Sequence, residues 1–168
     1  TRDKVISLNT ILSDGKKVVF RELSPEDFKR KCGQKDLEGN LYRQVWEELG
    51  QPETRAEIHA QFPKKSIHRR NTGYAVDELL KASQFEGTAD FNFCKLLAGS
   101  EGTLAFTTEI KLSLDPLPDP IEIVVAAHFE SIHESMKSAQ VAMKHEVTAV
   151  ELMDKIILDC TKESIEYS

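Results

Sequence analysis

Two strand-like segments joined by a four-residue turn impose the strongest local constraint on this 168-residue chain. Apolar and β-branched residues recur over 5–12 and again over 17–23, and Ser13-Asp14-Gly15-Lys16 lies between them. Because glycine readily adopts the positive φ that tight turns need, this pattern predicts a β-hairpin. A further apolar alternation over 103–114 predicts a long strand that pairs with this hairpin.

Helical signals follow the hairpin. Ser24 precedes a proline and two acidic residues, which is the pattern of an N-cap and predicts a short helix. The spacing of apolar residues predicts helical structure over 37–62, with a break at Gly50. We expect Trp46 and Phe62 to pack in the core between these two helices.

A proline-rich segment, Asp115 to Pro120, divides the pattern. Before it, we expect a short helix over 75–83. After it, we expect a strand over 121–127 and helices over 131–144 and 150–161. The predicted fold class is α+β: a mainly antiparallel sheet flanked by helices, followed by a partial second α+β unit.

The charge and the cysteines narrow the function classes. The chain has 22 Lys and Arg against 28 Asp and Glu, a net charge of −6, which argues against a nucleic-acid partner. No apolar run is long enough to span a membrane. The three cysteines and five histidines show no metal-binding spacing, so we assign no metal ligand and expect reduced thiols in a cytoplasmic protein. Cys94 is expected to be buried rather than reactive.

Two segments are candidates for ligand binding. Gly99-Ser100-Glu101-Gly102-Thr103 lies where a loop enters a strand. Its glycines either let backbone N–H groups approach a planar or anionic ligand or simply form a tight turn. The basic run from Lys64 to Arg70 either binds an anion or forms a solvated loop face.

Neighbouring residues carry a family resemblance. Residues 99–109 read GSEGTLAFTTE, which resembles the GSEGTLGxxTE signature of FAD-linked oxidases and dehydrogenases of the vanillyl-alcohol oxidase type. Residues 70–75 are similar to the NTGYD segment of that family, although Ala75 replaces its aspartate. Residues 5–20 look like its strand pair, and residues 149–154 resemble the opening of its cap domain.

The resemblance implies a domain organisation. Residues 1–115 would be the second lobe of an FAD-binding domain, with a helical insert at about 24–66. Residues 116–120 would be a linker, and 121–168 would begin the substrate-binding cap domain. The family's Gly-rich pyrophosphate loop is not in this sequence, so the expected partners are a first FAD lobe and the remainder of the cap within a longer protein.

The resemblance also implies site residues and a cofactor. FAD would bind in the longer protein, and we assign no catalytic residue to this chain. The residues expected to lie along the flavin are Asn71, Thr72, Gly73, Tyr74, Gly99, Ser100, Glu101, Gly102 and Thr103.

The sequence is most similar to large members of this family that oxidise 2-hydroxy acids such as D-lactate, glycolate or D-2-hydroxyglutarate. Some of these large members carry a downstream iron–sulfur module. The expected function is therefore that of a fragment of an FAD-dependent oxidoreductase, inactive alone, that transfers a hydride from such an acid to flavin. The alternative is a non-catalytic interaction or scaffold domain that retains the flavin-lobe fold. The expected location is cytoplasmic, either free or peripheral to the membrane.

Overall fold

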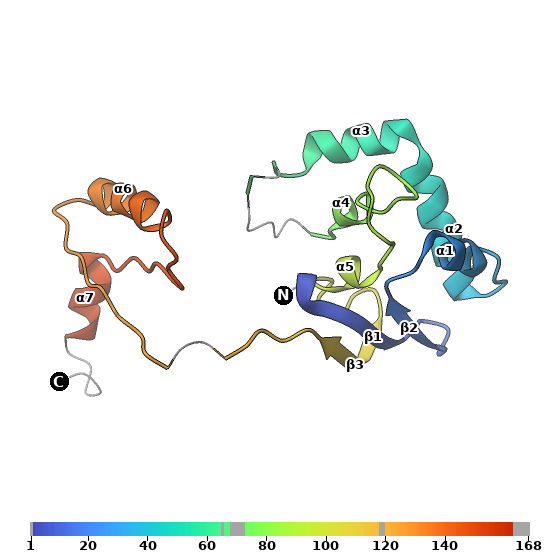
Figure 1. The fold of residues 1–168 in the computed structure, drawn as a ribbon, viewed down its shortest axis with the longest axis horizontal. Helices are drawn as coiled ribbons and strands as arrows, with labels where there is room; N and C mark the ends of the chain where they lie inside the picture. The colour runs from blue at the N-terminus through green and yellow to red at the C-terminus, as the bar shows by residue number, and fades with distance from the viewer. Residues whose placement is uncertain (1, 65, 68–72, 118–119, 163–168) are drawn as a thin grey trace. The chain divides into compact units, whose positions relative to one another are not determined.

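The chain forms two compact units, Thr1–Pro116 and Leu117–Ser168, in a computed structural model that describes residues 2–64, 66–67, 73–117 and 120–162. In chain order the elements of the first unit are η1 (Arg2–Lys4), β1 (Val5–Ile11), β2 (Lys17–Arg21), α1 (Pro25–Cys32), α2 (Leu37–Gly50), α3 (Pro52–Gln61), α4 (Val76–Leu79), α5 (Cys94–Leu97) and β3 (Phe106–Leu112) (Figure 1). The second unit contains α6 (Ile132–Ala142) and α7 (Lys155–Thr161). The division between the units falls within the proline-rich segment.

A three-stranded antiparallel sheet in the order β2-β1-β3 underlies the first unit. In register, Leu8 of β1 lies opposite Phe20 of β2 and opposite Ile110 of β3. Gly15 in the β1–β2 turn has a φ of +81°. The predicted hairpin, its pairing with a later strand and the α+β class are thus confirmed, although β3 is shorter than the predicted 103–114.

Polar side chains cap the N-terminal ends of α1 and α2. Ser24 Oγ accepts the Asp27 N–H at 3.2 Å at the start of α1, and Asp36 Oδ1 accepts the Gly39 N–H at 3.0 Å at the start of α2. These bonds satisfy N–H groups that have no partner within the helix. The predicted cap at Ser24 is confirmed, and the predicted helical region over 37–62 is present as α2 and α3.

Aromatic rings form the core between the sheet and the helices. Phe91 is fully buried, and its ring centroid lies 4.7 Å from that of Phe28, 4.8 Å from Phe93 and 5.9 Å from Tyr42. Such aromatic pairs contribute about 0.5–1.5 kcal/mol each beyond their buried area. Phe91 also exchanges backbone hydrogen bonds of 2.9 and 3.2 Å with Leu23. The segment that enters α5 is therefore anchored to both the sheet and the helices.

Trp46 is more exposed than predicted, with 41% of its surface accessible. Its ring centroid lies 5.5 Å from Phe28 and 6.3 Å from Phe85, and these two rings cover only part of an indole. Phe62 is partly buried against the same core. The expectation of core packing therefore holds in part for Phe62 and is wrong for Trp46.

The strand predicted over 121–127 is not formed. These residues have no regular secondary structure, their side chains are exposed, and the three-stranded sheet does not include them. The N–H and C=O groups of a strand need hydrogen-bond partners on a neighbouring backbone. An apolar sequence pattern does not provide that second backbone. The described part of the second unit consequently consists of helices and coil. The prediction of a second α+β unit is therefore wrong for these residues.

The helices of the second unit begin at capping side chains. Ser131 Oγ accepts the Glu134 N–H at 3.2 Å, so α6 confirms the helix predicted over 131–144. Asp154 Oδ1 accepts the Ile157 N–H at 2.8 Å, and α7 therefore starts later than the predicted 150. Among the described residues of this unit, none is buried.

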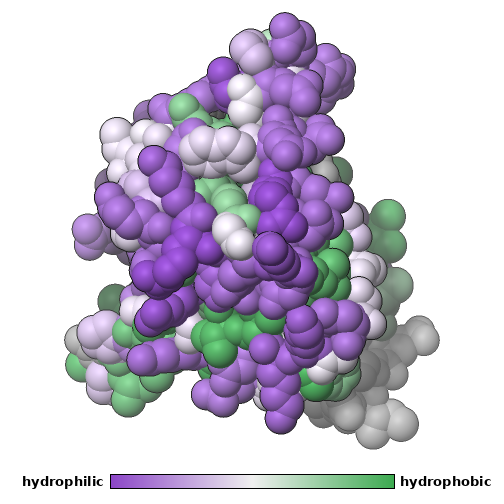
Figure 2. Space-filling view, turned by 90° about the vertical axis from the view of Figure 1, so that its right-hand side faces the viewer, coloured by the Kyte–Doolittle hydropathy of each residue, from purple (hydrophilic) through white to green (hydrophobic). Residues whose placement is uncertain are grey.

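The helices leave β3 uncovered. Leu8 is 4% exposed, whereas Ile110, its neighbour on β3, is 56% exposed. By contrast, mainly hydrophilic side chains cover the face of the first unit that carries α1, α2 and the hairpin turn, as Figure 2 shows. The edge strand thus presents apolar surface, a feature that often marks an interaction face.

Candidate functional site

The Gly99–Thr103 loop contains a tight turn with left-handed backbone. The Thr103 N–H donates to Ser100 O at 3.0 Å, and the two central residues, Glu101 and Gly102, have φ values of +53° and +74°. Positive φ at both central positions is the pattern of a type I′ turn. Gly99, immediately before the turn, has a φ of +108°. A left-handed glutamate is an uncommon conformation that surrounding structure must hold in place.

Tyr74 joins the two sequence motifs. Its hydroxyl lies 2.6 Å from Thr103 Oγ1, and Thr103 Oγ1 donates to Ser100 O at 2.6 Å. Because the one hydroxyl proton of threonine is used in the second bond, Tyr74 must donate in the first. Two segments that lie 29 residues apart in sequence are thus held together by a short chain of hydrogen bonds.

The loop has open space beside its glycines and backbone N–H groups without an acceptor in the described part of the chain. A Cβ built on Gly102 or on Gly73 would meet no atom within 4 Å. The N–H groups of Gly99, Glu101 and Gly102 donate to no acceptor among the described residues. Adjacent N–H groups in left-handed or turn conformation form concave anion-binding surfaces. The loop therefore has the backbone donors and the open space that a ligand with oxygen acceptors requires.

The structure brings together most, but not all, of the expected site residues. Gly73 and Tyr74 lie at the Gly99–Thr103 loop through the Tyr74 hydrogen bond. Ser100 is buried, with 5% of its surface exposed, so its backbone carbonyl rather than its side chain organises the turn. Asn71 and Thr72 lie outside the described residues, as do Arg69 and Arg70 of the basic run.

Sequence reasoning missed Arg2. Its guanidinium Nε and Nη2 donate to Ala98 O at 3.3 and 3.2 Å, directly before the loop. The next residue, Asp3, pairs instead with Lys95 at 2.9 Å, and this hydrogen bond lowers the pKa of the Asp3 carboxyl. No local signal marks Arg2 in the sequence, because its partner is 96 residues away.

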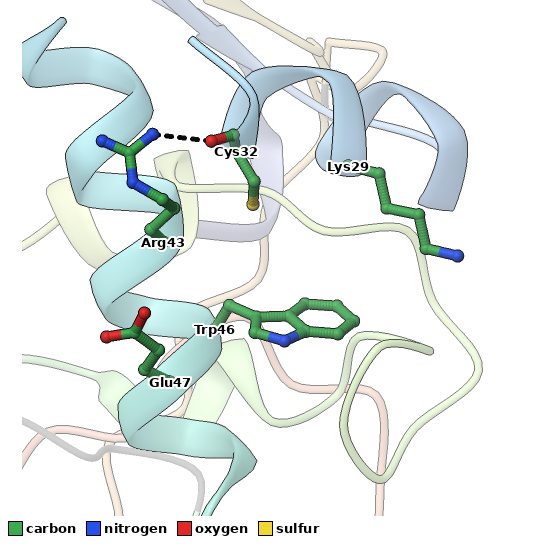
Figure 3. Close-up of a pocket in the computed structure, with 5 residues that line it drawn as sticks. All are labelled: Lys29, Cys32, Arg43, Trp46 and Glu47. Atoms are coloured by element: carbon green, nitrogen blue, oxygen red, sulfur yellow. Dashed lines mark hydrogen bonds between the residues drawn. The ribbon is translucent and has the colours of Figure 1, made fainter. Parts of the chain in front are cut away.

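A hollow lies between α1 and α2, as Figure 3 shows, with a volume of about 130 Å³. Arg43 Nη1 donates to Cys32 O at 2.6 Å and thereby satisfies a carbonyl at the end of α1. Burial raises the pKa of the Cys32 thiol, which leaves it protonated and weakly nucleophilic. The polar groups here stabilise a helix end, and no residue of the two sequence motifs lines this hollow.

Cys94 is buried as expected. Its Sγ donates to Phe20 O at 3.2 Å, and burial raises the pKa of the thiol to about 11. Such a thiol contributes no thiolate nucleophile near neutral pH. Within the described ranges, no three His, Cys, Asp or Glu side chains gather closely enough to hold a metal ion. No helix in those ranges combines the length and apolarity of a membrane span.

The first unit is thus an α+β domain in which a left-handed glycine loop presents free N–H groups. No family model matches the chain, and no solved structure matches it. Curated relatives do match. The chain is 28% identical over 170 residues to D-2-hydroxyglutarate dehydrogenase of Pseudomonas putida, an alignment that covers 100% of the chain and 16% of that enzyme.

Two further relatives carry the same name. The Escherichia coli D-2-hydroxyglutarate dehydrogenase is 28% identical over 99% of the chain, and the Haemophilus influenzae enzyme is 30% identical over 67% of it. These alignments cover 16% and 10% of the two enzymes. The chain is therefore similar along its length to one segment of D-2-hydroxyglutarate dehydrogenases, and the resemblance to D-2-hydroxy acid dehydrogenases expected from the sequence is confirmed.

Proposed function

We propose that this chain is the flavin-binding segment of an FAD-dependent oxidoreductase that oxidises a D-2-hydroxy acid. The observation that carries the proposal is the left-handed loop at Gly99–Thr103, hydrogen-bonded to Tyr74, in a chain similar throughout to D-2-hydroxyglutarate dehydrogenases. Bound FAD supplies the acceptor for the substrate hydride. The substrate class is D-2-hydroxyglutarate and its smaller analogues D-lactate and glycolate.

The residues of the chain position the cofactor. The N–H groups of Gly99, Glu101 and Gly102 donate to its oxygens, because they have no other acceptor among the described residues. Gly73 and Gly102 let the ring approach the backbone, since a side chain would occupy that space. The bond from Tyr74 keeps the two segments at a constant separation. Asn71 and Thr72 complete the proposed set.

The proposal includes the organisation expected from the sequence. The first unit is the second lobe of an FAD domain, and the second unit begins the cap that covers the substrate. The first lobe, the rest of the cap and the groups that bind the hydroxy acid belong to a longer protein, which we place in the cytoplasm. A downstream iron–sulfur module is a further proposed partner.

The flavin spectrum of the longer protein tests this function. We expect the purified protein to show flavin absorbance that bleaches when D-2-hydroxyglutarate is added without oxygen. The L-enantiomer is the control and should leave the spectrum unchanged. A protein that contains no flavin, or whose flavin is reduced by none of D-2-hydroxyglutarate, D-lactate and glycolate, would exclude the proposal and favour the scaffold alternative.

The 168-residue chain by itself provides a second test. Ligand sites commonly bury roughly 70–90% of a bound molecule, whereas one lobe covers one side of a flavin. We therefore expect weak FAD binding by the isolated chain in a fluorescence titration. A yellow, stoichiometric complex would show that the first lobe is not required.

A further inference from the structure

We propose that Arg2 binds an anionic oxygen of the ligand held at the Gly99–Thr103 loop. This inference rests on the proposed flavin function and adds a residue to it. The anion is either the pyrophosphate of FAD or the carboxylate of the hydroxy acid, which present the same chemistry to a guanidinium.

The position of Arg2 is the first argument. Its Nε and Nη2 atoms both donate to Ala98 O, the carbonyl that precedes the left-handed Gly99. A Cβ on Gly99 would lie 3.3 Å from Arg2 Nη2, so the glycine allows the guanidinium to lie against the loop. The cation therefore lies beside Gly99, the first residue of the loop.

The charge of Arg2 is the second argument. The ion pairs of the described residues include none with Arg2, although the guanidinium is half-buried. Its neighbours are engaged elsewhere, Asp3 with Lys95 and Lys4 with Asp115. Glu101, the acidic residue of the loop, makes no ion pair with it. A half-buried cation without a counter-charge is stabilised by a bound anion.

The remaining donor capacity is the third argument. Arg2 Nη1 donates to no atom of the described residues. A guanidinium has five N–H donors in a planar fork, which suits carboxylate and phosphate oxygens. The carbonyl of Ala98 orients the fork from one edge and leaves the other edge for the ligand.

The test uses the longer protein with Arg2→Gln, Arg2→Lys and a control, Lys4→Gln. The control removes one positive charge from the same 3-10 turn, but Lys4 is paired with an exposed aspartate. Two dissociation constants are measured: that of FAD with the flavin-free protein, and that of D-2-hydroxyglutarate from the concentration dependence of the rate at which it bleaches the bound flavin without oxygen. Riboflavin, which lacks phosphate, is titrated in parallel.

We expect Arg2→Gln to weaken one of these two equilibria about tenfold or more, as for other hydrogen bonds to charged groups. Weaker FAD binding with unchanged riboflavin binding assigns the anion to the pyrophosphate. Weaker hydroxy-acid binding at saturating FAD assigns it to the carboxylate. Arg2→Lys keeps the positive charge but lacks the planar fork, so its dissociation constant should lie between those of the wild type and Arg2→Gln. The lysine variant also provides a test of the inference if Arg2→Gln folds poorly.

Two results would overturn the inference. In the first, both equilibria are unchanged while the melting temperature falls, which leaves Arg2 as a structural clamp on Ala98. In the second, Lys4→Gln has the same effect as Arg2→Gln, which reduces the result to overall charge. A wild-type protein without flavin would instead overturn the proposed function itself, so the two failures are distinguishable.

Discussion

A comparison of Gly102→Ala with Gly15→Ala separates the effect of a side chain on backbone stability from its effect on flavin binding. Both glycines have similar left-handed φ values, +74° and +81°, and at both an added Cβ meets no atom within 4 Å. The left-handed conformation costs a residue with a side chain roughly 1–2 kcal/mol. Both substitutions should therefore lower the free energy of unfolding by about this amount, as measured by urea denaturation of the chain.

The two variants should differ in flavin binding. Gly15 lies in the hairpin turn, which contributes no residue to the proposed site, whereas the Cβ at Gly102 would enter the space assigned to the ligand. Crowding a filled site by a methyl group costs roughly 1–3 kcal/mol, which corresponds to about fivefold to hundredfold weaker binding. The assay is FAD titration of the flavin-free longer protein. Gly102→Val should lower the flavin content further, because its side chain is branched at Cβ.

Equal flavin affinities for Gly102→Ala and Gly15→Ala would remove Gly102 from the cofactor site. A loss of stability in Gly102→Ala that greatly exceeds the loss in Gly15→Ala would show that the space beside the loop is filled by the protein itself. Either result would refute the reasoning from the open glycine positions.

Four further variants or conditions test the structure. Tyr74→Phe should cost about 1 kcal/mol or less and speed amide hydrogen exchange at Thr103, because the hydroxyl that holds Thr103 is lost. Unchanged exchange would contradict the link. Phe91→Ala should lower the free energy of unfolding by about 3–5 kcal/mol in urea, since the ring is fully buried. At Cys94 the unfolded chain loses its thiol proton near the ordinary pKa of 9.0 and the folded chain only near 11, so stability should decline as the pH rises through this window. In the native chain at neutral pH, iodoacetamide should label the exposed Cys160 and spare Cys94, as read by mass spectrometry.

Local patterns were sufficient for several elements. The hairpin depends on a glycine between two apolar alternations, and the start of α1 depends on a serine three residues before the N–H that it caps. The tight turn that the sequence allowed at Gly99–Thr103 is likewise present, with positive φ at Gly99 and Gly102. In each case the interaction that decides the structure lies within a few residues, so the sequence pattern contains it.

The tertiary structure decided what depends on distant partners. The predicted strand at 121–127 did not join the sheet. Trp46 stayed partly exposed, because only two rings cover it. Tyr74 reaches Thr103 across 29 residues, and Arg2 reaches Ala98 across 96. The sequence determined which residues could turn, cap or donate. Long-range packing determined which of them meet, because hydrogen bonds and buried surface require a partner that local spacing does not specify.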